Sequence, residues 1–244
     1  MEFTYQSYRG LLSLLKEKGY SFTDYHQYQD HSRCVILRHD IDTSLEQAVQ
    51  LARLEAEQGV HSTWFVLLRT DFYNPASQKS LEKLHAIQAM GHEIGLHFDE
   101  VAYGKALTEE ETRQSIIREC GLLSALLDTP VTTVSMHRPS KATLEADLQI
   151  PGIVNSYGKT FFHDFKYLSD SRRRWREPVL DIIRSGEYDR LHILTHAFWY
   201  HDQDMSLEDT VFDFIKTAKN DRYLSLRENI TDLEKLKENI NFEK

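Results

Sequence analysis

The stretch Leu37-Arg38-His39-Asp40-Ile41-Asp42-Thr43 decides how the rest of the chain is read. It continues an apolar run, Cys34-Val35-Ile36-Leu37, which predicts a buried parallel strand. A helix start with capping-box spacing follows at Ser44. The two carboxylates Asp40 and Asp42 are therefore expected at the carboxyl end of a strand, the place where parallel α/β folds carry their chemistry.

Composition places the chain among globular proteins with an ordinary core. It has 244 residues, of which 41% are hydrophobic and 27% charged. No Pro/Gly/Ser-rich linker divides it, so a single domain over residues 1–244 is expected. The formal net charge of −9 argues against a general nucleic-acid binder, which needs a basic face. The one basic cluster, Arg172-Arg173-Arg174, is expected to be a solvated loop with one arginine available to substrate.

Location is predicted from cysteine usage and from the lack of targeting patterns. Cys34 and Cys120 are far apart and show no pairing pattern, which favours a reducing compartment. The first residues, Met1-Glu2-Phe3-Thr4-Tyr5, lack the basic and apolar regions of a secretory signal. No window approaches 18 apolar residues, so no membrane span is expected. We therefore expect a cytoplasmic protein.

Strand patterns alternate with helix patterns along most of the chain. Strands are expected at 34–39, 61–68, 92–97, 131–136, 152–157, 165–169 and 191–195. Helices are expected at 4–18, after Ser44 as far as Gly59, at 78–90, from Thr108 to Leu127 and at 178–185, with two amphipathic helices after Ser206. This rhythm predicts a parallel β/α architecture and leaves two forms open, a doubly wound sheet and a barrel.

Polar residues stand at the ends of four predicted strands. Asp40 and Asp42 follow the first, His97 ends the third, His137 and Arg138 end the fourth, and His196 follows the last. Because the carboxyl ends of parallel strands converge on one face, these side chains are expected to meet in space.

This set of residues suits metal-assisted hydrolysis. Aspartate and two histidines favour a borderline divalent cation such as Zn²⁺, with other divalent transition metals also suited. A second carboxylate can act as general base and a histidine can protonate a leaving amine. The chain contains no Gly-x-Ser-x-Gly elbow and no phosphate-binding glycine loop, so a serine mechanism is not expected.

The order of these motifs resembles the polysaccharide deacetylases, the NodB-homology carbohydrate esterases. Arg38-His39-Asp40-Ile41-Asp42-Thr43 is similar to the first motif, in a form nearer the deformylase branch that acts on aminoarabinose lipids. The closest match is Gly91-His92-Glu93-Ile94-Gly95-Leu96-His97. His137-Arg138-Pro139 and Leu194-Thr195-His196 stand for the later motifs. The resemblance spans about residues 34–200 and implies an irregular (β/α)7 barrel, with an extra N-terminal helix and C-terminal helices.

The resemblance also implies roles for single residues. Asp40 would be the general base and His196 the general acid, while Asp42 and His97 would bind the metal. Arg138 would orient Asp40 and would itself be held by Asp170. Aromatic residues after His196 could stack on a sugar ring, with Trp199 and Tyr200 as the substrate-binding candidates.

One position departs from the family pattern. The second metal-binding histidine of the family comes four residues after the first, and here that position is Val101. Three explanations stay open: His137 supplies the imidazole, Asp99 or Glu100 supplies a carboxylate, or the metal is weak or absent. Two other histidines are expected to be structural, His92 at a turn and His39 on the opposite face of its strand.

The function expected from residues and resemblance together is a metal-dependent hydrolase acting on a linear amide bond. It would remove an acyl group, most simply N-acetyl, from an amino sugar or glycoconjugate precursor, a small molecule or oligosaccharide. The alternatives are a barrel that binds carbohydrate or a partner without turnover, and an amide hydrolase for a substrate that is not a sugar.

Overall fold

The sheet at the centre of the structure follows the rhythm expected from the sequence. A computed structural model describes residues 1–231 and residue 233. The chain divides into two compact units, Met1–Gln203 and Asp204–Lys244, and each is described by itself. The sheet and every candidate site residue lie in the first unit. The single domain over 1–244 stays a prediction.

From β2 to β8, strands and α-helices of the first unit alternate along the chain. The strands are β1 (Ser21–Thr23), β2 (Cys34–Ile41), β3 (Thr63–Leu67), β4 (Glu93–Asp99), β5 (Thr133–His137), β6 (Val154–Asn155), β7 (Lys166–Ser169) and β8 (Arg190–Thr195). The α-helices are α1 (Tyr5–Glu17), α2 (Leu45–Glu57), α3 (Gln78–Ala89), α4 (Glu109–Leu127), α5 (Lys141–Glu145), α6 (Lys159–His163) and α7 (Val179–Ser185). Short 3₁₀ turns are η1 (Tyr28–Asp30), η2 (Glu100–Tyr103), η3 (Ser171–Arg173) and η4 (Ala197–Trp199).

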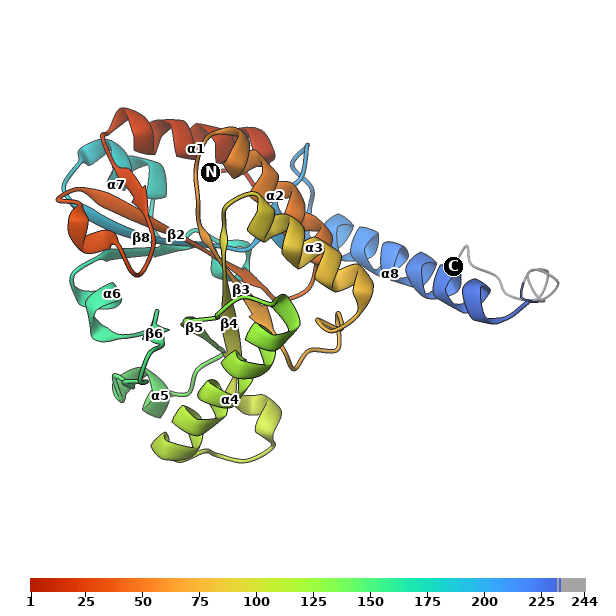
Figure 1. Cartoon of the computed structure of the whole chain (residues 1–244). Coiled ribbons are helices and arrows are strands. Elements are labelled where there is room, and N and C mark those ends of the chain that lie inside the picture. Colours follow the sequence, from red (N-terminus) through yellow and green to blue (C-terminus); the bar gives the residue numbers. More distant parts are fainter. Residues whose placement is uncertain (232, 234–244) are drawn as a thin grey trace. The chain divides into compact units, whose positions relative to one another are not determined.

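All described strand pairs are parallel, and the sheet curls into an open barrel (Figure 1). The strand order is β6-β5-β4-β3-β2-β8-β7. β1 pairs with the first residues of β2, while β3 pairs with its last ones, from Arg38 opposite Thr63 onward. No ladder joins the outer strands β6 and β7 in the part of the chain described, so the barrel is open there. The expectation of an irregular (β/α)7 barrel is confirmed, and the choice between sheet and barrel is thereby made.

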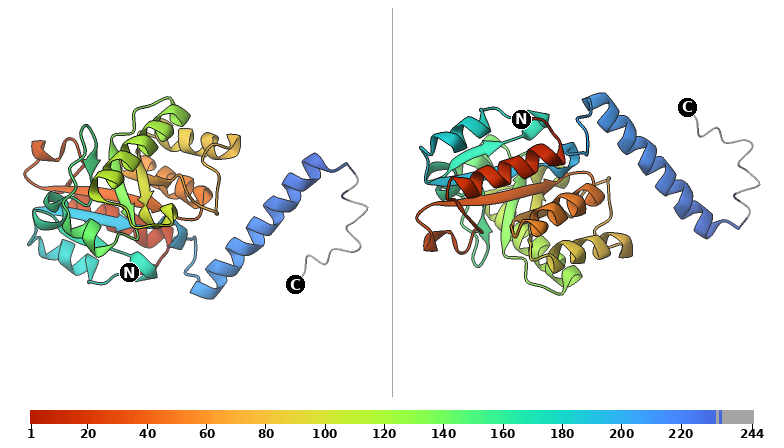
Figure 2. Two further views of the ribbon diagram at one scale, coloured as in Figure 1. Left: turned by 90° about the horizontal axis from the view of Figure 1, so that it is seen from below. Right: turned by 90° about the horizontal axis from the view of Figure 1, so that it is seen from above.

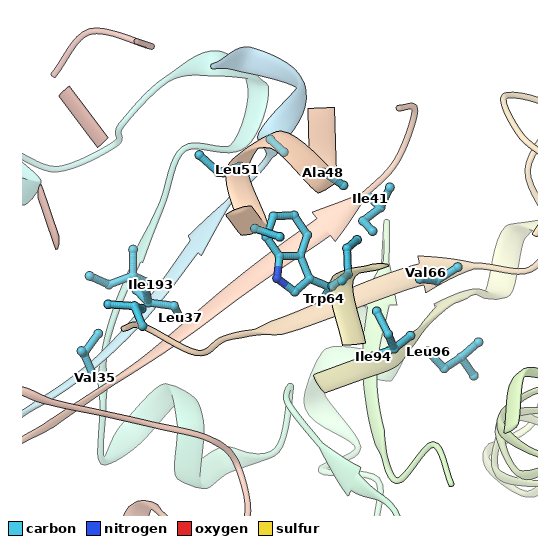
Figure 3. Packing of buried hydrophobic residues seen from close by; sticks show 14 of the residues in the cluster. Val35, Leu37, Ile41, Ala48, Leu51, Trp64, Val66, Ile94, Leu96 and Ile193 are labelled. Carbon is cyan, nitrogen blue, oxygen red and sulfur yellow. The ribbon is translucent and has the colours of Figure 1, made fainter. Parts of the chain in front are cut away.

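Alternation along β2 separates the barrel interior from the layer under the helices. Cys34 and Ile36 point inward and pack with Phe65 and two phenylalanines of the α6 region. Val35 and Leu37 point the other way, into the large apolar core beneath the helices. Figure 3 shows Trp64 in that core, with Ala48 and Leu51 of α2 on one side of it and the strands on the other. All eight residues of β2 are buried, as expected for a central parallel strand.

The helices succeed one another around the outside of the sheet. Neighbouring pairs in contact are α7 with α1, α1 with α2, α2 with α3, and α3 with α4. The right-hand view of Figure 2 shows α1 alongside the strands. Side chains cap the first turns of α1, α2, α3 and α4. The Ser44 hydroxyl accepts a hydrogen bond from the Gln47 backbone N–H, and Thr108 forms a full capping box with Glu111.

A buried carboxylate joins the first two helices to the sheet. Glu55 of α2 is fully buried and accepts hydrogen bonds from Tyr8 Oη at 2.5 Å and Ser62 Oγ at 2.6 Å. His39 Nε2 lies 2.9 Å from the same carboxylate, and His39 Nδ1 lies 2.7 Å from Thr195 Oγ1. Burial raises the pKa of Glu55, but the neighbouring His39 outweighs it and the pKa lies below its usual value. His39 therefore faces the helix layer, as strand alternation predicts.

The expected elements differ from the observed ones in three places. The strand expected at 152–157 shrinks to Val154–Asn155, and the short elements β1, α5 and α6 were not expected. The described part of the second unit contains the long helix α8 (Leu207–Asn229), which includes Leu226 of the second amphipathic helix expected there. The end of that expected helix, at Ile240, lies outside the described residues. Within those residues, no helix combines the length and the apolar composition needed to cross a membrane.

Candidate active site

The strand ends bring the candidate residues to one rim of the barrel. Asp40 and Asp42 come from β2 and the loop after it, His97 from β4, His137 from the end of β5, and His196 from the residue after β8. All five line one cavity of about 510 Å³. Residues up to 156 positions apart in the chain thus share one pocket because parallel strands all end on the same side.

Three of these side chains present donor atoms at one point. Asp42 Oδ1 lies 3.3 Å from His97 Nε2 and 3.3 Å from His137 Nδ1, and the two imidazole nitrogens are 3.1 Å apart. Ligands held ~2.0–2.1 Å from a tetrahedral zinc ion lie about 3.3–3.4 Å from one another. The triangle is therefore close to the size that one divalent cation requires.

The oxygen of Asp42 within this triangle fits a cation on two further counts. It is buried, and it accepts no hydrogen bond from the described residues. Burial raises the pKa of Asp42, but His137 and His97 outweigh it and hold the pKa well below its usual range. Asp42 is thus an anion at neutral pH, and two nitrogens with one carboxylate oxygen form a donor set typical of zinc.

A buried arginine holds the second carboxylate, Asp40. Arg38 Nε and Nη2 lie 3.0 and 2.8 Å from the two oxygens of Asp40, and the Arg38 side chain is fully buried. The guanidinium is also bonded to the Ser135 hydroxyl and lies over the ring of Tyr157 at 4.8 Å. Burial raises the pKa of Asp40, but the charge of Arg38 outweighs it, so the pKa lies below the usual value.

Arg138 does not orient Asp40, which corrects the role expected from the sequence. Arg138 Nη2 donates to Asp99 Oδ2 at 2.6 Å, not to Asp40, and its side chain is 63% exposed. Arg138 follows β5 with a positive φ of 48°, which turns the chain out of the barrel. Arg38 lies two residues before Asp40 on the same strand, so both side chains point inward and Arg38 reaches the carboxylate first. An arginine inside an otherwise apolar strand was the available sequence signal.

Asp170 bonds to His196, the predicted general acid, and not to Arg138. Its carboxylate oxygens lie 2.6 Å from His196 Nδ1 and 3.1 Å from the His196 backbone nitrogen. Burial lowers the pKa of His196, but the charge of Asp170 outweighs it and raises the pKa to about 9. His196 Nε2 then points toward the cavity, 3.8 Å from Asp42 Oδ2. The pairing expected between Asp170 and Arg138 is therefore wrong.

Val101, the position that departs from the family pattern, does not line the cavity. Val101 lies in the turn η2 and is 58% exposed. Asp99 is held by Arg138, and Glu100 bonds to Ser140 and Thr143 at the start of α5. Of the three explanations for the missing imidazole, the geometry favours His137.

The predicted stacking residues lie elsewhere. Tyr200 is fully buried and packs edge-on against Tyr8 and Phe3 in the core. Neither Trp199 nor Tyr200 is among the residues that line the cavity, because the turn η4 carries them back under α1 and α2. The aromatic wall comes instead from Tyr157, Phe162 and Tyr167.

His92 is structural, as expected. Its Nε2 lies 2.9 Å from the Ala52 carbonyl oxygen, and its Nδ1 accepts from the Ser62 backbone N–H at 3.2 Å. Burial lowers its pKa, so it is a neutral hydrogen-bonding residue behind the sheet.

No family model matches the chain, and no curated protein matches it. Several solved structures do match. The chain is similar to CE4 deacetylases. One match is BA3943, a CE4 family pseudoenzyme from Bacillus anthracis, with 15% identity and a TM-score of 0.45 over 79% of this chain and 62% of that one.

Two other matches are named as deacetylases. The peptidoglycan deacetylase PdaC from Bacillus subtilis has 14% identity and a TM-score of 0.44, over 81% of this chain and 97% of that one. The chitin deacetylase from Colletotrichum lindemuthianum has 16% identity and a TM-score of 0.42, over 75% of this chain and 81% of that one. The chain spans less than two thirds of the length of the BA3943 protein. At these values the site geometry, not the likeness, carries the functional argument.

Proposed function

We propose that the protein is a divergent polysaccharide-deacetylase-type hydrolase that removes an acyl group, N-acetyl in the simplest case, from an amino sugar. One observation carries this proposal: the triangle of Asp42, His97 and His137 lies between an anionic Asp40 and a cationic His196 in one cavity. A base, an acid and a set of metal ligands around one pocket are the parts that amide hydrolysis needs.

Asp42, His97 and His137 are the residues that would hold a divalent metal, with zinc preferred for this donor set. When bound, the metal supplies Lewis-acid activation of water and polarisation of the amide carbonyl. Asp42 contributes a negative charge, and the two imidazoles contribute nitrogen donors. His97 is 2% exposed and His137 is 18% exposed, so the second imidazole faces the open side of the pocket.

Asp40 is the proposed general base. It is ionised because Arg38 balances its charge, and its Oδ2 lies 3.5 Å from His97 Nε2. A water molecule beside this triangle is therefore within reach of the carboxylate, which takes its proton as the oxygen attacks the amide carbon. Arg38 positions the base and keeps it charged inside a barrel interior where an unpaired carboxylate would be unstable.

His196 is the proposed general acid. Because its pKa is about 9, the imidazole carries a proton at neutral pH, with Nδ1 on Asp170 and Nε2 toward the cavity. The Nε2 proton passes to the amide nitrogen as the carbon–nitrogen bond breaks, and the amine leaves neutral. Asp170 fixes the ring orientation and stabilises the imidazolium before transfer.

The location proposed for this activity is the cytoplasm. Cys34 and Cys120 are both buried free thiols, a state that fits a reducing compartment. Nucleic acid is not among the ligands that we propose, because a chain with a net charge of −9 lacks the positive charge that phosphate binding needs.

The deciding experiment compares Asp40→Asn with Asp71→Asn, an exposed aspartate outside the cavity. Each protein is stripped with chelator, reloaded with Zn²⁺, and assayed for acetate release from N-acetylglucosamine oligomers. Asp40→Asn is expected to bind one metal ion per chain, while its turnover falls by roughly 10²-fold or more. Asp71→Asn is expected to retain both the metal ion and the wild-type turnover. No stoichiometric metal in the wild type and no change in its melting temperature with Zn²⁺ would support a barrel that binds carbohydrate without turnover.

A further inference from the structure

The cavity has a cationic side that the proposed chemistry does not use. Arg172 and Arg176 both line it, on the segment between β7 and α7. Neither makes an ion pair or a hydrogen bond within the described part of the chain, in contrast to Arg138, which is held by Asp99. Two guanidinium groups that form no ion pair among the described residues therefore line the pocket of a chain whose net charge is −9.

The backbone that carries Arg172 is held in an unusual conformation. Arg172 has φ 61° and ψ 33°, and Arg173 has φ 55°. Residues with a side chain rarely adopt this left-handed region, least of all twice in succession. The turn is fixed on both sides, by the hydrogen bond from the Ser171 backbone N–H to Ser169 Oγ and by that from the Arg174 backbone N–H to the Asp170 carbonyl oxygen. Left-handed backbone at residues other than glycine is enriched at active sites and ligand-binding turns.

This turn is directly joined to the proposed acid. Asp170, which holds His196, comes two residues before Arg172. The position of Arg172 relative to the reacting amide is therefore set by a short, hydrogen-bonded segment and not by a mobile tail.

Three aromatic side chains, Tyr157, Phe162 and Tyr167, line another side of the cavity. Tyr157 and Phe162 have ring centroids 5.2 Å apart, and Phe162 and Tyr167 have theirs 4.6 Å apart. Such a wall offers the faces on which a sugar ring stacks. The pocket thus has three parts: the Asp/His triangle for the amide, the aromatic wall for the ring, and the arginine pair for a further group. A cavity of about 510 Å³ accommodates a monosaccharide with one such substituent.

We propose that the substrate is an N-acylated amino sugar carrying an oxyanion, a phosphate or a carboxylate, which Arg172 and Arg176 bind. This inference rests on the proposed function for the identity of the reacting bond, but the anion site itself stands on the arginines. Guanidinium groups bind both oxyanions through paired N–H donors. An acidic protein repels an anionic substrate at long range, so a local cationic pair is what allows such a substrate to enter.

The test uses variants matched within one loop. Arg172→Gln, Arg176→Gln and the double variant are compared with Arg174→Gln, an exposed arginine of the same segment that does not line the cavity. Turnover is measured with zinc-loaded protein on N-acetylglucosamine, N-acetylglucosamine 1-phosphate and N-acetylmuramic acid. The phosphate and carboxylate arms identify which oxyanion is preferred.

The wild type is expected to prefer an anionic sugar over the neutral one by roughly 10-fold or more in kcat/KM. Each single cavity variant is expected to lose roughly 10-fold on the anionic substrate, through KM, and less than twofold on the neutral one. Arg174→Gln should match the wild type. The preference should also shrink as salt rises, because screening weakens exposed charge pairs.

Binding of the deacylated products provides a readout that does not depend on turnover. Calorimetry compares glucosamine 1-phosphate with glucosamine on the wild type and the double variant. If no sugar is turned over but glucosamine 1-phosphate binds and the double variant loses it, the anion site stands and the proposed hydrolase does not. Equal kcat/KM for neutral and anionic sugars, or equal losses on both in the double variant, would overturn the anion site and leave the hydrolase intact. No selective binding and no turnover overturns both.

Discussion

Arg38 and Asp40 lie two residues apart on one strand and bond to each other inside the barrel, with both carboxylate oxygens contacted by the guanidinium at 3.0 and 2.8 Å. A parallel strand that is buried on both sides carries few charges, and this one carries a pair. The pair explains how a carboxylate can stay ionised at the mouth of an apolar barrel.

Replacing Arg38 by methionine is expected to destabilise the fold by roughly 3 kcal/mol, because Asp40 is left buried without its partner. The depressed pKa of Asp40 means that this residue stabilises the fold above its unfolded pKa of 3.8, and that the contribution is lost as pH falls through the folded value. Without Arg38 the pKa of Asp40 rises, so the acidic limb of the kcat/KM profile should move to higher pH.

Arg138→Met is the matched control for this change. Its partner Asp99 is buried but the Arg138 side chain is 63% exposed, so the expected loss is below about 1 kcal/mol. Urea denaturation and pH–rate profiles measure both variants. A larger effect of Arg138→Met than of Arg38→Met on the acidic limb would restore Arg138 as the residue that orients Asp40.

Asp170 sets the upper pH limit of activity. His196 works as an acid only while protonated, so turnover in the wild type should fall as pH rises through about 9. Asp170→Asn removes the charge that raises this pKa, and the falling limb should move to lower pH while kcat at pH 8 drops roughly 10-fold or more. Kinetic pH profiles, together with an NMR titration of His196, measure the shift. An unchanged alkaline limb in Asp170→Asn would show that another group donates the proton.

His137, not the position of Val101, should decide metal affinity. His137→Ala is expected to weaken Zn²⁺ binding by more than the roughly 10–100-fold that loss of an outer hydrogen-bond partner costs. Val101→His should leave affinity unchanged, since Val101 is 58% exposed and does not line the cavity. His85→Ala, an exposed histidine bonded to Gln88 on α3, is the control. Competition with a chromogenic chelator gives the three affinities, and a gain in Val101→His would contradict this ligand set.

Gly95 allows the barrel interior to close. A Cβ there would lie 2.5 Å from Phe65 Cε1 and 3.0 Å from the Thr133 carbonyl oxygen. Gly95→Ala should therefore cost about 1–3 kcal/mol through overpacking. Gly121→Ala on α4 meets nothing within 4 Å and should stabilise the protein by about 0.5–1 kcal/mol, because alanine is the better helix residue. Thermal unfolding of both variants measures the difference. A neutral Gly95→Ala would mean that the strands can separate at this point.

Much of the fold is readable from local pattern. The apolar run before Asp40 and the β-rich segment around Trp64 predict β2 and β3 because buried strands need little beyond hydrophobicity and β-propensity. The capping box at Thr108 predicts the start of α4. The elements that local pattern misses are short ones, such as β1 and α6, whose few residues are fixed by neighbours distant in sequence.

The sequence by itself determined the order of strands and helices and the identity of the polar residues at their ends, since both depend on residue type and spacing along the chain. It also placed Asp40, Asp42, His97 and His196 on one rim. Only the tertiary structure decided which partner each one has: Arg38 rather than Arg138 for Asp40, His196 rather than Arg138 for Asp170, and Tyr157 rather than Tyr200 for the cavity wall. Pairing of this kind depends on strand register and on the direction of each side chain, and both are set by packing across the barrel.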